Sequence, residues 1–155
     1  MSDDTDERLL GPETAYGVAR RWYHVPVLLV VMAFMFWTRY QNYDAFTRGD
    51  GGFWLQAVDS WYHWRATNWI VDNYPRAMSY DPWTGFPEGA FAGQFGSLFD
   101  QIVATVAMVI GTGNPGQGDV LTAVLVTVPA LAALAAVPTY YVGKRVGNRI
   151  GGLVG

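Results

Sequence analysis

The sequence predicts an all-α membrane protein, and three observations lead to that prediction. Apolar residues make up 51% of the 155 residues and only 15% are charged, against roughly 25% charged in soluble domains. The apolar residues gather in long blocks instead of following the period of an amphipathic helix. The segment between two of these blocks, 44–119, is acidic and rich in aromatic residues. We therefore expect membrane-spanning helices joined by a large external loop with helical and irregular parts.

Residues 1–21 are expected to form a cytosolic N-terminal tail. The chain opens with acidic residues, whereas a signal peptide opens with a basic region followed by an apolar core. The tail ends at Arg20 and Arg21, and Trp22 and Tyr23 come next. Basic residues followed by aromatic ones are typical of the cytosolic membrane interface.

The first expected transmembrane helix covers residues 22–43. The stretch 25–37 is continuously apolar except for Pro26, which the first turn of a helix tolerates. With its flanking aromatic residues the segment reaches about the 20 residues that a span requires. Arg39, near the far end, can extend its head group to water. A buried core helix is the alternative, but the segment has no polar face to present to water.

The second expected transmembrane helix covers residues 120–142, which carry no charge. Pro129 and Pro138 lie inside it, and membrane helices tolerate proline when neighbours satisfy the freed carbonyls. Residues 143–155, with Lys144 and Arg145, are expected to form a cytosolic loop and the start of another span. The positive-inside rule places both basic groups in the cytosol, so two crossings separate them and 44–119 faces outward.

Two helices are expected within the external loop. No glycine or proline interrupts 60–71, which predicts a helix at about 60–72 with Asp59 at its start, where a carboxylate can cap free N–H groups. The stretch 95–111 contains an apolar run that is too short to span a membrane. We therefore expect a surface or re-entrant helix there, followed by a glycine-rich loop at 111–119.

Asp59 and His63 are the first candidate site residues, since residues four apart share a helix face. A carboxylate and an imidazole can bind Mn²⁺, Mg²⁺ or Zn²⁺, although two ligands do not make a site; the alternative is a helix cap beside an ordinary polar histidine. Arg65 and Arg76 could bind phosphate or sugar, or make ordinary cation–π contacts. Asp81 lies in a turn-rich stretch, and fixing that turn is its alternative role.

The composition also excludes some classes of function. The chain has no cysteine, so it forms neither disulfides nor thiolate metal sites. Its net charge of −3 gives no reason to expect a nucleic-acid partner. It contains no phosphate-binding glycine loop, nucleophile elbow or zinc-binding helix motif.

The stretch Asp59–Arg65, with the sequence DSWYHWR, resembles the acid–aromatic–histidine–arginine signature of the oligosaccharyltransferase catalytic subunit. In that family the signature lies in the first external loop. The later segments Tyr74–Arg76, Asp81–Trp83 and Phe86–Gly89 match the family's continuation in order and spacing. The single-subunit archaeal enzymes, the dolichyl-phosphooligosaccharide–protein glycotransferases, look most similar, and the resemblance extends over about residues 20–155.

The resemblance implies a multi-pass cell-membrane protein whose active-site loop faces outward. The family transfers an oligosaccharide from a dolichyl phosphate carrier to the asparagine of Asn-x-Ser/Thr sequences. Its partners are therefore a lipid-linked oligosaccharide, an acceptor polypeptide and membrane lipid. The family works with a divalent metal, which implies Mn²⁺ or Mg²⁺ as the cofactor.

Asp59 falls on the family's first acidic motif, so the resemblance implies that it is a metal ligand and contacts the acceptor asparagine. Gln94 aligns with a position where relatives contact the lipid-linked glycan. No specific role transfers to Arg65 or Arg76. The family's second acidic motif, a later glutamate motif and the Trp-Trp-Asp-Tyr-Gly signature are absent. The chain is therefore expected to be the N-terminal part of a polytopic helical glycosyltransferase and to be inactive alone.

Two other functions remain open at this point. One is another polytopic glycosyltransferase with a lipid-phosphate-sugar donor, such as a protein mannosyltransferase, which also places an acid in its first external loop. The other is a non-catalytic membrane subunit, in which Asp59 caps a helix and the aromatic residues form an interfacial belt.

Overall fold

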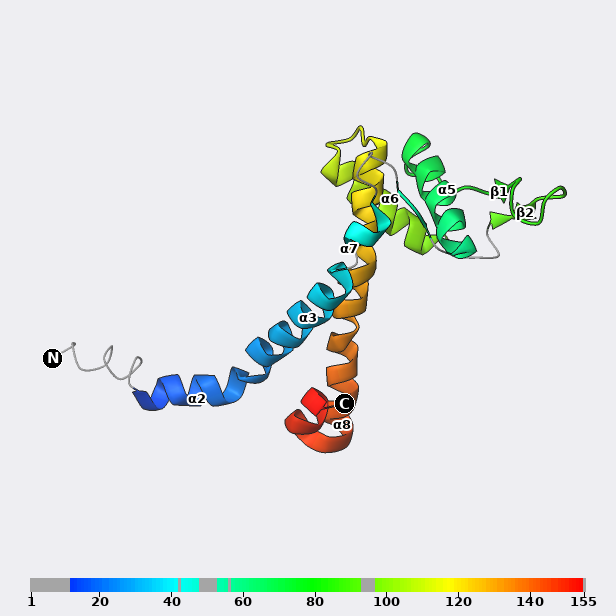
Figure 1. The fold of residues 1–155 in the computed structure, drawn as a ribbon. Coiled ribbons are helices and arrows are strands. Elements are labelled where there is room, and N and C mark those ends of the chain that lie inside the picture. Colours follow the sequence, from blue (N-terminus) through cyan, green and yellow to red (C-terminus); the bar gives the residue numbers. More distant parts are fainter. Residues whose placement is uncertain (1–11, 42, 48–52, 56, 93–96, 155) are drawn as a thin grey trace. The chain divides into compact units, whose positions relative to one another are not determined.

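The computed structural model describes residues 12–41, 43–47, 53–55, 57–92 and 97–154, and most of them are helical (Figure 1). The helices are α2 (Pro12–Trp22), α3 (His24–Tyr40), α4 (Tyr43–Phe46), α5 (Val58–Asp72), α6 (Leu98–Ile110), α7 (Gln117–Leu134) and α8 (Ala136–Val154), and the strands are β1 (Tyr80–Asp81) and β2 (Ala90–Phe91). The chain divides into two compact units, Met1–Trp37 with Ala132–Gly155, and Thr38–Leu131.

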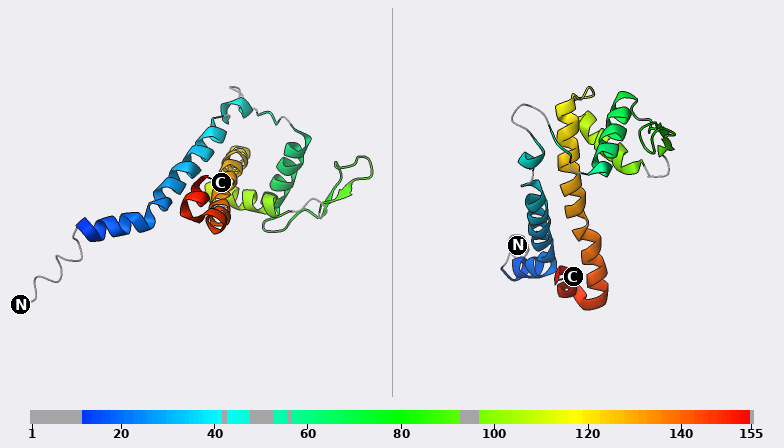
Figure 2. Two further views of the ribbon diagram at one scale, coloured as in Figure 1. Left: turned by 90° about the horizontal axis from the view of Figure 1, so that it is seen from below. Right: turned by 45° about the vertical axis from the view of Figure 1, so that its right-hand side comes forward.

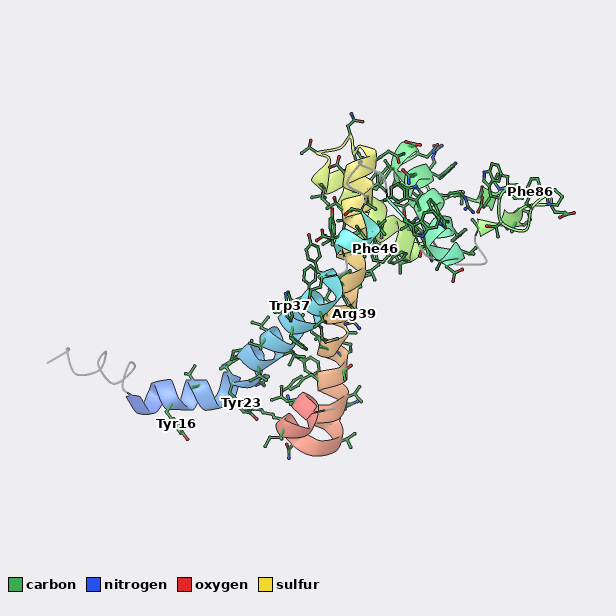
Figure 3. The ribbon with its side chains drawn as sticks, viewed as in Figure 1. Tyr16, Tyr23, Trp37, Arg39, Phe46 and Phe86 are labelled. Atoms are coloured by element: carbon green, nitrogen blue, oxygen red, sulfur yellow. The ribbon has the colours of Figure 1, made fainter. Side chains whose placement is uncertain are left out.

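The apolar helix α3 buries none of its 17 residues. Leu29, Val30 and Phe34 each expose more than half of their side-chain surface, and the Trp37 side chain projects from the same helix (Figure 3). Helix α2 precedes it and was not foreseen from the sequence. Proline at its first position suits a helix start, because the missing N–H would have no helical partner there.

Helix α8 contains a sharp break at Gly147 and Asn148, where the backbone leaves helical geometry. Close backbone approach on either side of the break requires glycine: a Cβ on Gly143 would lie 2.7 Å from the Gly151 carbonyl oxygen. The sequence analysis expected residues 143–155 to begin as a loop, and they are helical up to and beyond this kink. Nothing before Gly147 interrupts the helix, which is why it continues past residue 142.

Helices α7 and α8 together contain the segment Gln117–Leu153, which by length and composition could cross a membrane. No other helix in the described part of the chain meets the same length and composition. Pro129 lies inside α7, which ends at Leu134, and a single residue separates it from the start of α8 at Ala136. The expected span at 120–142 therefore consists of two consecutive helices. Helix α3 forms the core of the expected span at 22–43 and is shorter than that range by five residues.

Helices α5 and α6 pack against each other and form the centre of the second unit, and they lie side by side in both views of Figure 2. Val103 and Ala107 of α6 are fully buried beside Trp64 of α5, and Leu55, Val120 and Ala123 complete this core. Burying a valine side chain fully contributes about 1.5–3 kcal/mol.

Sequence explains where these two helices end. Pro75 follows the α5 C-cap at Asn73, and a proline disfavours helical geometry in the residue before it. Helix α6 ends at Gly111, whose amide donates to the Ala107 carbonyl at 2.8 Å. A Cβ on Gly111 would lie 2.3 Å from the Pro115 Cα, so only glycine fits this turn.

A short antiparallel hairpin formed by β1 and β2 follows α5, and Tyr80 pairs with Phe91 in it. The all-α prediction did not include this sheet, although it foresaw the turn chemistry between the strands. Gly85 and Gly89 both adopt positive φ there, at 69° and 71°, which glycine adopts without steric cost. Phe86 lies in the connecting turn and points away from α5 (Figure 3).

Candidate functional site

Asp59 lies in the first turn of α5 with an exposed side chain. The helix starts two residues earlier than expected, so Ala57 is the N-cap and makes no side-chain capping bond. The capping role considered for Asp59 is therefore wrong, because the carboxylate lies inside the first turn and not before it. Within the described residues, no hydrogen bond or ion pair occupies its oxygens.

A groove of about 280 Å³ lies beside this carboxylate, lined by Val58, Asp59, Tyr62, His63 and Thr84. All five residues belong to α5 or to the hairpin turn that follows it. Asp59 and His63 thus share one helix face, as the four-residue spacing predicted. The groove is lined by the carboxylate of Asp59 and the imidazole of His63 from α5, and by Thr84 from the turn.

His63 bonds to a carboxylate that the sequence analysis did not consider. Its Nδ1 lies 2.8 Å from Oδ1 of Asp100 in the first turn of α6. Asp100 is 1% exposed, and this burial, which outweighs the hydrogen bond from His63, raises the pKa of Asp100. The imidazole also packs edge-on against Phe99, with ring centres 5.0 Å apart.

Arg65 and Asp81 form the second buried polar contact of the region. The guanidinium of Arg65 donates to Asp81 Oδ2 at 2.6 Å. The Asp81 carboxylate also accepts the Trp83 amide at 3.0 Å and the Thr84 hydroxyl at 2.6 Å. Burial alone would raise the pKa of Asp81, but these three hydrogen bonds outweigh burial and lower the pKa. Asp81 therefore fixes the turn, and Arg65 anchors that turn to α5.

Tyr62 is the remaining titratable group in the groove. Burial, together with the nearby carboxylates of Asp100 and Asp81, raises the pKa of Tyr62. The phenol thus stays neutral at physiological pH and donates to the Ala92 carbonyl at 3.5 Å. Its ring forms one side of the groove and ties α5 to the end of the hairpin.

Two other candidate residues lie away from this groove or outside the described residues. Arg76 is exposed in the turn after α5, where its backbone amide donates to Asn73 at 3.0 Å. Gln94, expected to contact a glycan, lies outside the residues that the structure describes.

A divalent metal fits Asp59 as one ligand among several. Its carboxylate oxygens are the hard donors that Mg²⁺ and Mn²⁺ prefer, and they are open to the groove. Across the described ranges, no three His, Asp or Glu side chains gather closely enough to hold a metal ion. A complete metal site therefore needs ligands beyond those in the described residues.

Asp100 is the residue that the sequence analysis missed. A lone acid at the start of an apolar helix could have signalled a buried pair, because buried carboxylates require a partner. The chain has only two histidines, so His63 was an available partner, but the 37-residue separation gives no local pattern.

The chain belongs to the oligosaccharyl transferase STT3 family, because the sequence model described as "Oligosaccharyl transferase STT3, N-terminal" matches residues 27–155. This match covers the groove, both of its anchoring ion pairs and the apolar helices. The family resemblance drawn from the DSWYHWR stretch is thereby confirmed.

Two relatives make the assignment more specific. The chain is 44% identical over 151 residues to a dolichyl-monophosphooligosaccharide–protein glycotransferase, AglB, of Haloferax volcanii, which covers 97% of this chain and 14% of that protein. It is 31% identical over 93 residues to the dolichyl-phosphooligosaccharide-protein glycotransferase 3 of Archaeoglobus fulgidus, covering 59% of this chain and 10% of that protein. The chain thus spans about a seventh or less of these relatives. No solved structure matches it.

Proposed function

We propose that this chain is the N-terminal part of a membrane oligosaccharyltransferase. The whole protein would transfer an oligosaccharide from a dolichyl phosphate carrier to the asparagine of Asn-x-Ser/Thr in an acceptor polypeptide. The main support is the 44% identity to a named glycotransferase across nearly the whole chain. The family match favours this function over a mannosyltransferase or a non-catalytic subunit.

The proposal includes a membrane topology with spans at 22–43 and 120–142, and residues 44–119 on the external face. The uncovered apolar side chains of α3 and the apolar segment Gln117–Leu153 support it. Arg21 and the pair Lys144 and Arg145 follow the positive-inside rule under this topology. The α5 groove then faces the compartment that holds the lipid-linked donor and the acceptor.

Asp59 is assigned the central chemical role in this proposal, as a ligand of Mn²⁺ or Mg²⁺ and a contact to the acceptor asparagine. A divalent ion, when bound, neutralises the negative charge that accumulates on the phosphate leaving group. Asp59 supplies a carboxylate oxygen at the groove and, among the residues that the structure describes, takes part in no ion pair. The same carboxylate can accept an N–H of the acceptor amide and so hold that poor nucleophile in place.

The other candidate residues receive lesser roles. Gln94 is proposed to contact the lipid-linked glycan, as the family resemblance implies. Arg65 and Asp81 are structural, because they bond to each other. Arg76 is exposed, so it remains available to a phosphate or sugar group. A direct metal contact from His63 would use Nε2, since Nδ1 bonds to Asp100.

The test of the function is Asp59→Ala in the full-length protein, scored by glycosylation of an acceptor peptide with Mn²⁺ present. We expect at least about a 100-fold loss of rate, since a catalytic metal supplies several kcal/mol of transition-state stabilisation. Asp72→Ala, at the exposed end of the same helix, is the matched control and should keep wild-type activity. Wild-type activity in Asp59→Ala would refute the role given to this carboxylate.

The topology is tested independently of activity. Asp72→Cys introduces the sole cysteine into this part of the protein, and a membrane-impermeant maleimide should label it from outside intact cells. Labelling only after the membrane is opened would place the groove on the cytosolic side and rule out the proposed function.

A further inference from the structure

Two hydrogen bonds connect the α5 region to α6, one close to Asp59 and one at the opposite end of α5. Near Asp59, His63 bonds to buried Asp100 at 2.8 Å. At the other end of α5, the Tyr74 hydroxyl lies 3.2 Å from the hydroxyl of Thr105. Both bonds connect the α5 region to α6, so they provide a matched pair for comparison.

The Asp100 carboxylate has no access to water that could replace His63. It is 1% exposed in a mostly apolar helix, and a buried carboxylate without a partner is strongly unfavourable. Among the described residues, His63 is its hydrogen-bonding partner. The pair therefore favours one position of the second α5 turn relative to the first α6 turn.

The packing around the imidazole restricts it further. Tyr62 and Phe99 contact the ring edge-on, with ring centres at 5.2 Å and 5.0 Å. His63 keeps 34% of its side chain exposed, and it lines the groove beside Asp59. Because the His63 ring bonds to α6 and also lines the groove, the position of α6 determines where this part of the groove wall lies.

Asp59 depends on this anchor because it has none of its own. Within the described residues no hydrogen bond or ion pair holds its side chain, so its position follows from the α5 backbone and its rotamer. Residues 59 and 63 lie one turn apart on the same face. A rotation of α5 that broke the His63–Asp100 bond would therefore also displace the Asp59 carboxylate.

We propose that His63 and Asp100 form a positioning pair that sets the Asp59 carboxylate relative to the rest of the metal site. The inference rests on the proposed function, because it assigns the pair an effect on metal-dependent glycosylation. His63 is then a positioning residue, and its contribution to the reaction passes through Asp59.

The experiment measures two quantities on the full-length protein in membranes. One is the dissociation constant for Mn²⁺, read from the EPR signal of free Mn²⁺, and we expect every variant to change it by the same factor as the second. The second is the Mn²⁺ concentration that gives half-maximal glycosylation. We expect His63→Ala to raise this concentration by roughly tenfold, as removal of groups that orient metal ligands commonly does, while activity at saturating Mn²⁺ falls less. His63→Asn, whose amide can still bond to Asp100, should recover most of the wild-type value. Thr105→Val is the control and should leave the Mn²⁺ dependence unchanged, because it removes the bond at the far end.

The outcomes separate this inference from the function itself. If the wild type glycosylates with Mn²⁺ and Asp59→Ala does not, but His63→Ala keeps the wild-type Mn²⁺ dependence, the positioning role is wrong and the function stands. An equal shift in Thr105→Val would show a general stability effect and would also overturn the inference. An inactive wild type with every acceptor peptide would count against the proposed function instead.

If His63→Ala does not accumulate in the membrane, a second pair of variants, at Asp100, tests the same inference. Asp100→Asn keeps a hydrogen-bonding group of the same shape, and Asp100→Leu removes it without leaving a buried charge. The inference requires near wild-type Mn²⁺ dependence in Asp100→Asn and a clear shift in Asp100→Leu. Identical behaviour of these two variants would contradict it.

Discussion

The α5–α6 region and helix α3 differ in what they bury: the first buries paired carboxylates, and the second buries no residue. In the α5–α6 region, each of the two buried carboxylates has a partner: Asp100 pairs with His63 and Asp81 with Arg65. In α3, by contrast, no residue is buried and large apolar side chains are exposed. Buried charge requires internal partners, whereas uncovered apolar surface requires an apolar environment. The first region is thus organised by its own contacts, and the second is suited to lipid.

The largest expected effect comes from introducing a charge into each region at a matched residue. Phe34 in α3 is 59% exposed and Phe86 in the hairpin turn is 73% exposed. We expect Phe34→Asp to oppose membrane insertion by about 3 kcal/mol, the cost of an aspartate near the bilayer centre. Phe86→Asp, in a segment expected to face water, should insert normally. The fraction of each variant released from membranes by alkaline extraction measures its insertion. Equal release of the two variants would contradict the proposed difference between α3 and the hairpin turn.

The next effect concerns the Arg65–Asp81 pair. Arg65→Ala leaves the Asp81 carboxylate buried without its cation. We expect a loss of about 2 kcal/mol in local stability, below the 3–5 kcal/mol of fully buried pairs because the Arg65 side chain is 35% exposed. Hydrogen exchange of residues 79–92 in the full-length protein measures this loss. Glu88→Gln, an exposed charge in the same turn, should leave exchange unchanged, and a similar increase in both would show that the pair is not the cause.

A pH effect follows from the lowered pKa of Asp81. Its stabilisation is present above the unfolded-state pKa, near pH 4, and is lost as pH falls through the lower folded-state pKa. We therefore expect protection of 79–92 from exchange to decrease below about pH 4. Asp81→Asn should remove this pH dependence, and a wild-type profile that stays flat to pH 2 would contradict it.

The smallest effect is expected at the far end of α5. Thr105→Val removes the hydroxyl bond with Tyr74, which is exposed to water. Such a bond contributes about 0.5–1 kcal/mol, and the thermal inactivation temperature should fall by only a few degrees. A loss as large as that of Arg65→Ala would mean that exposed bonds matter here as much as buried ones.

Local signals in the sequence predicted the positions of the helices better than the contacts between residues of different helices. The uninterrupted stretch before Pro75 predicted a helix at about 60–72, and α5 occupies Val58–Asp72. Asp59 was misread as a cap because helix ends shift by one or two residues without a clear signal. The partner of His63 could not be predicted, because 37 residues separate it from Asp100 and spacing rules reach only one or two turns. At the kink, Asn148 has φ 66° and ψ −165°, a combination found essentially only in glycine, so an asparagine there gave no signal of the kink.

The Asp59 carboxylate makes no hydrogen bond or ion pair within the described residues, and this has a consequence for purification of the protein. Many small metal-binding domains unfold when a chelator removes their ion, because binding energy and folding energy are the same. Here the core of α5 and α6 is built without Asp59, so removing a cation from the proposed site should leave the helices intact. The protein could then be emptied, purified and reloaded with a different ion, and a single preparation would allow several metals to be compared.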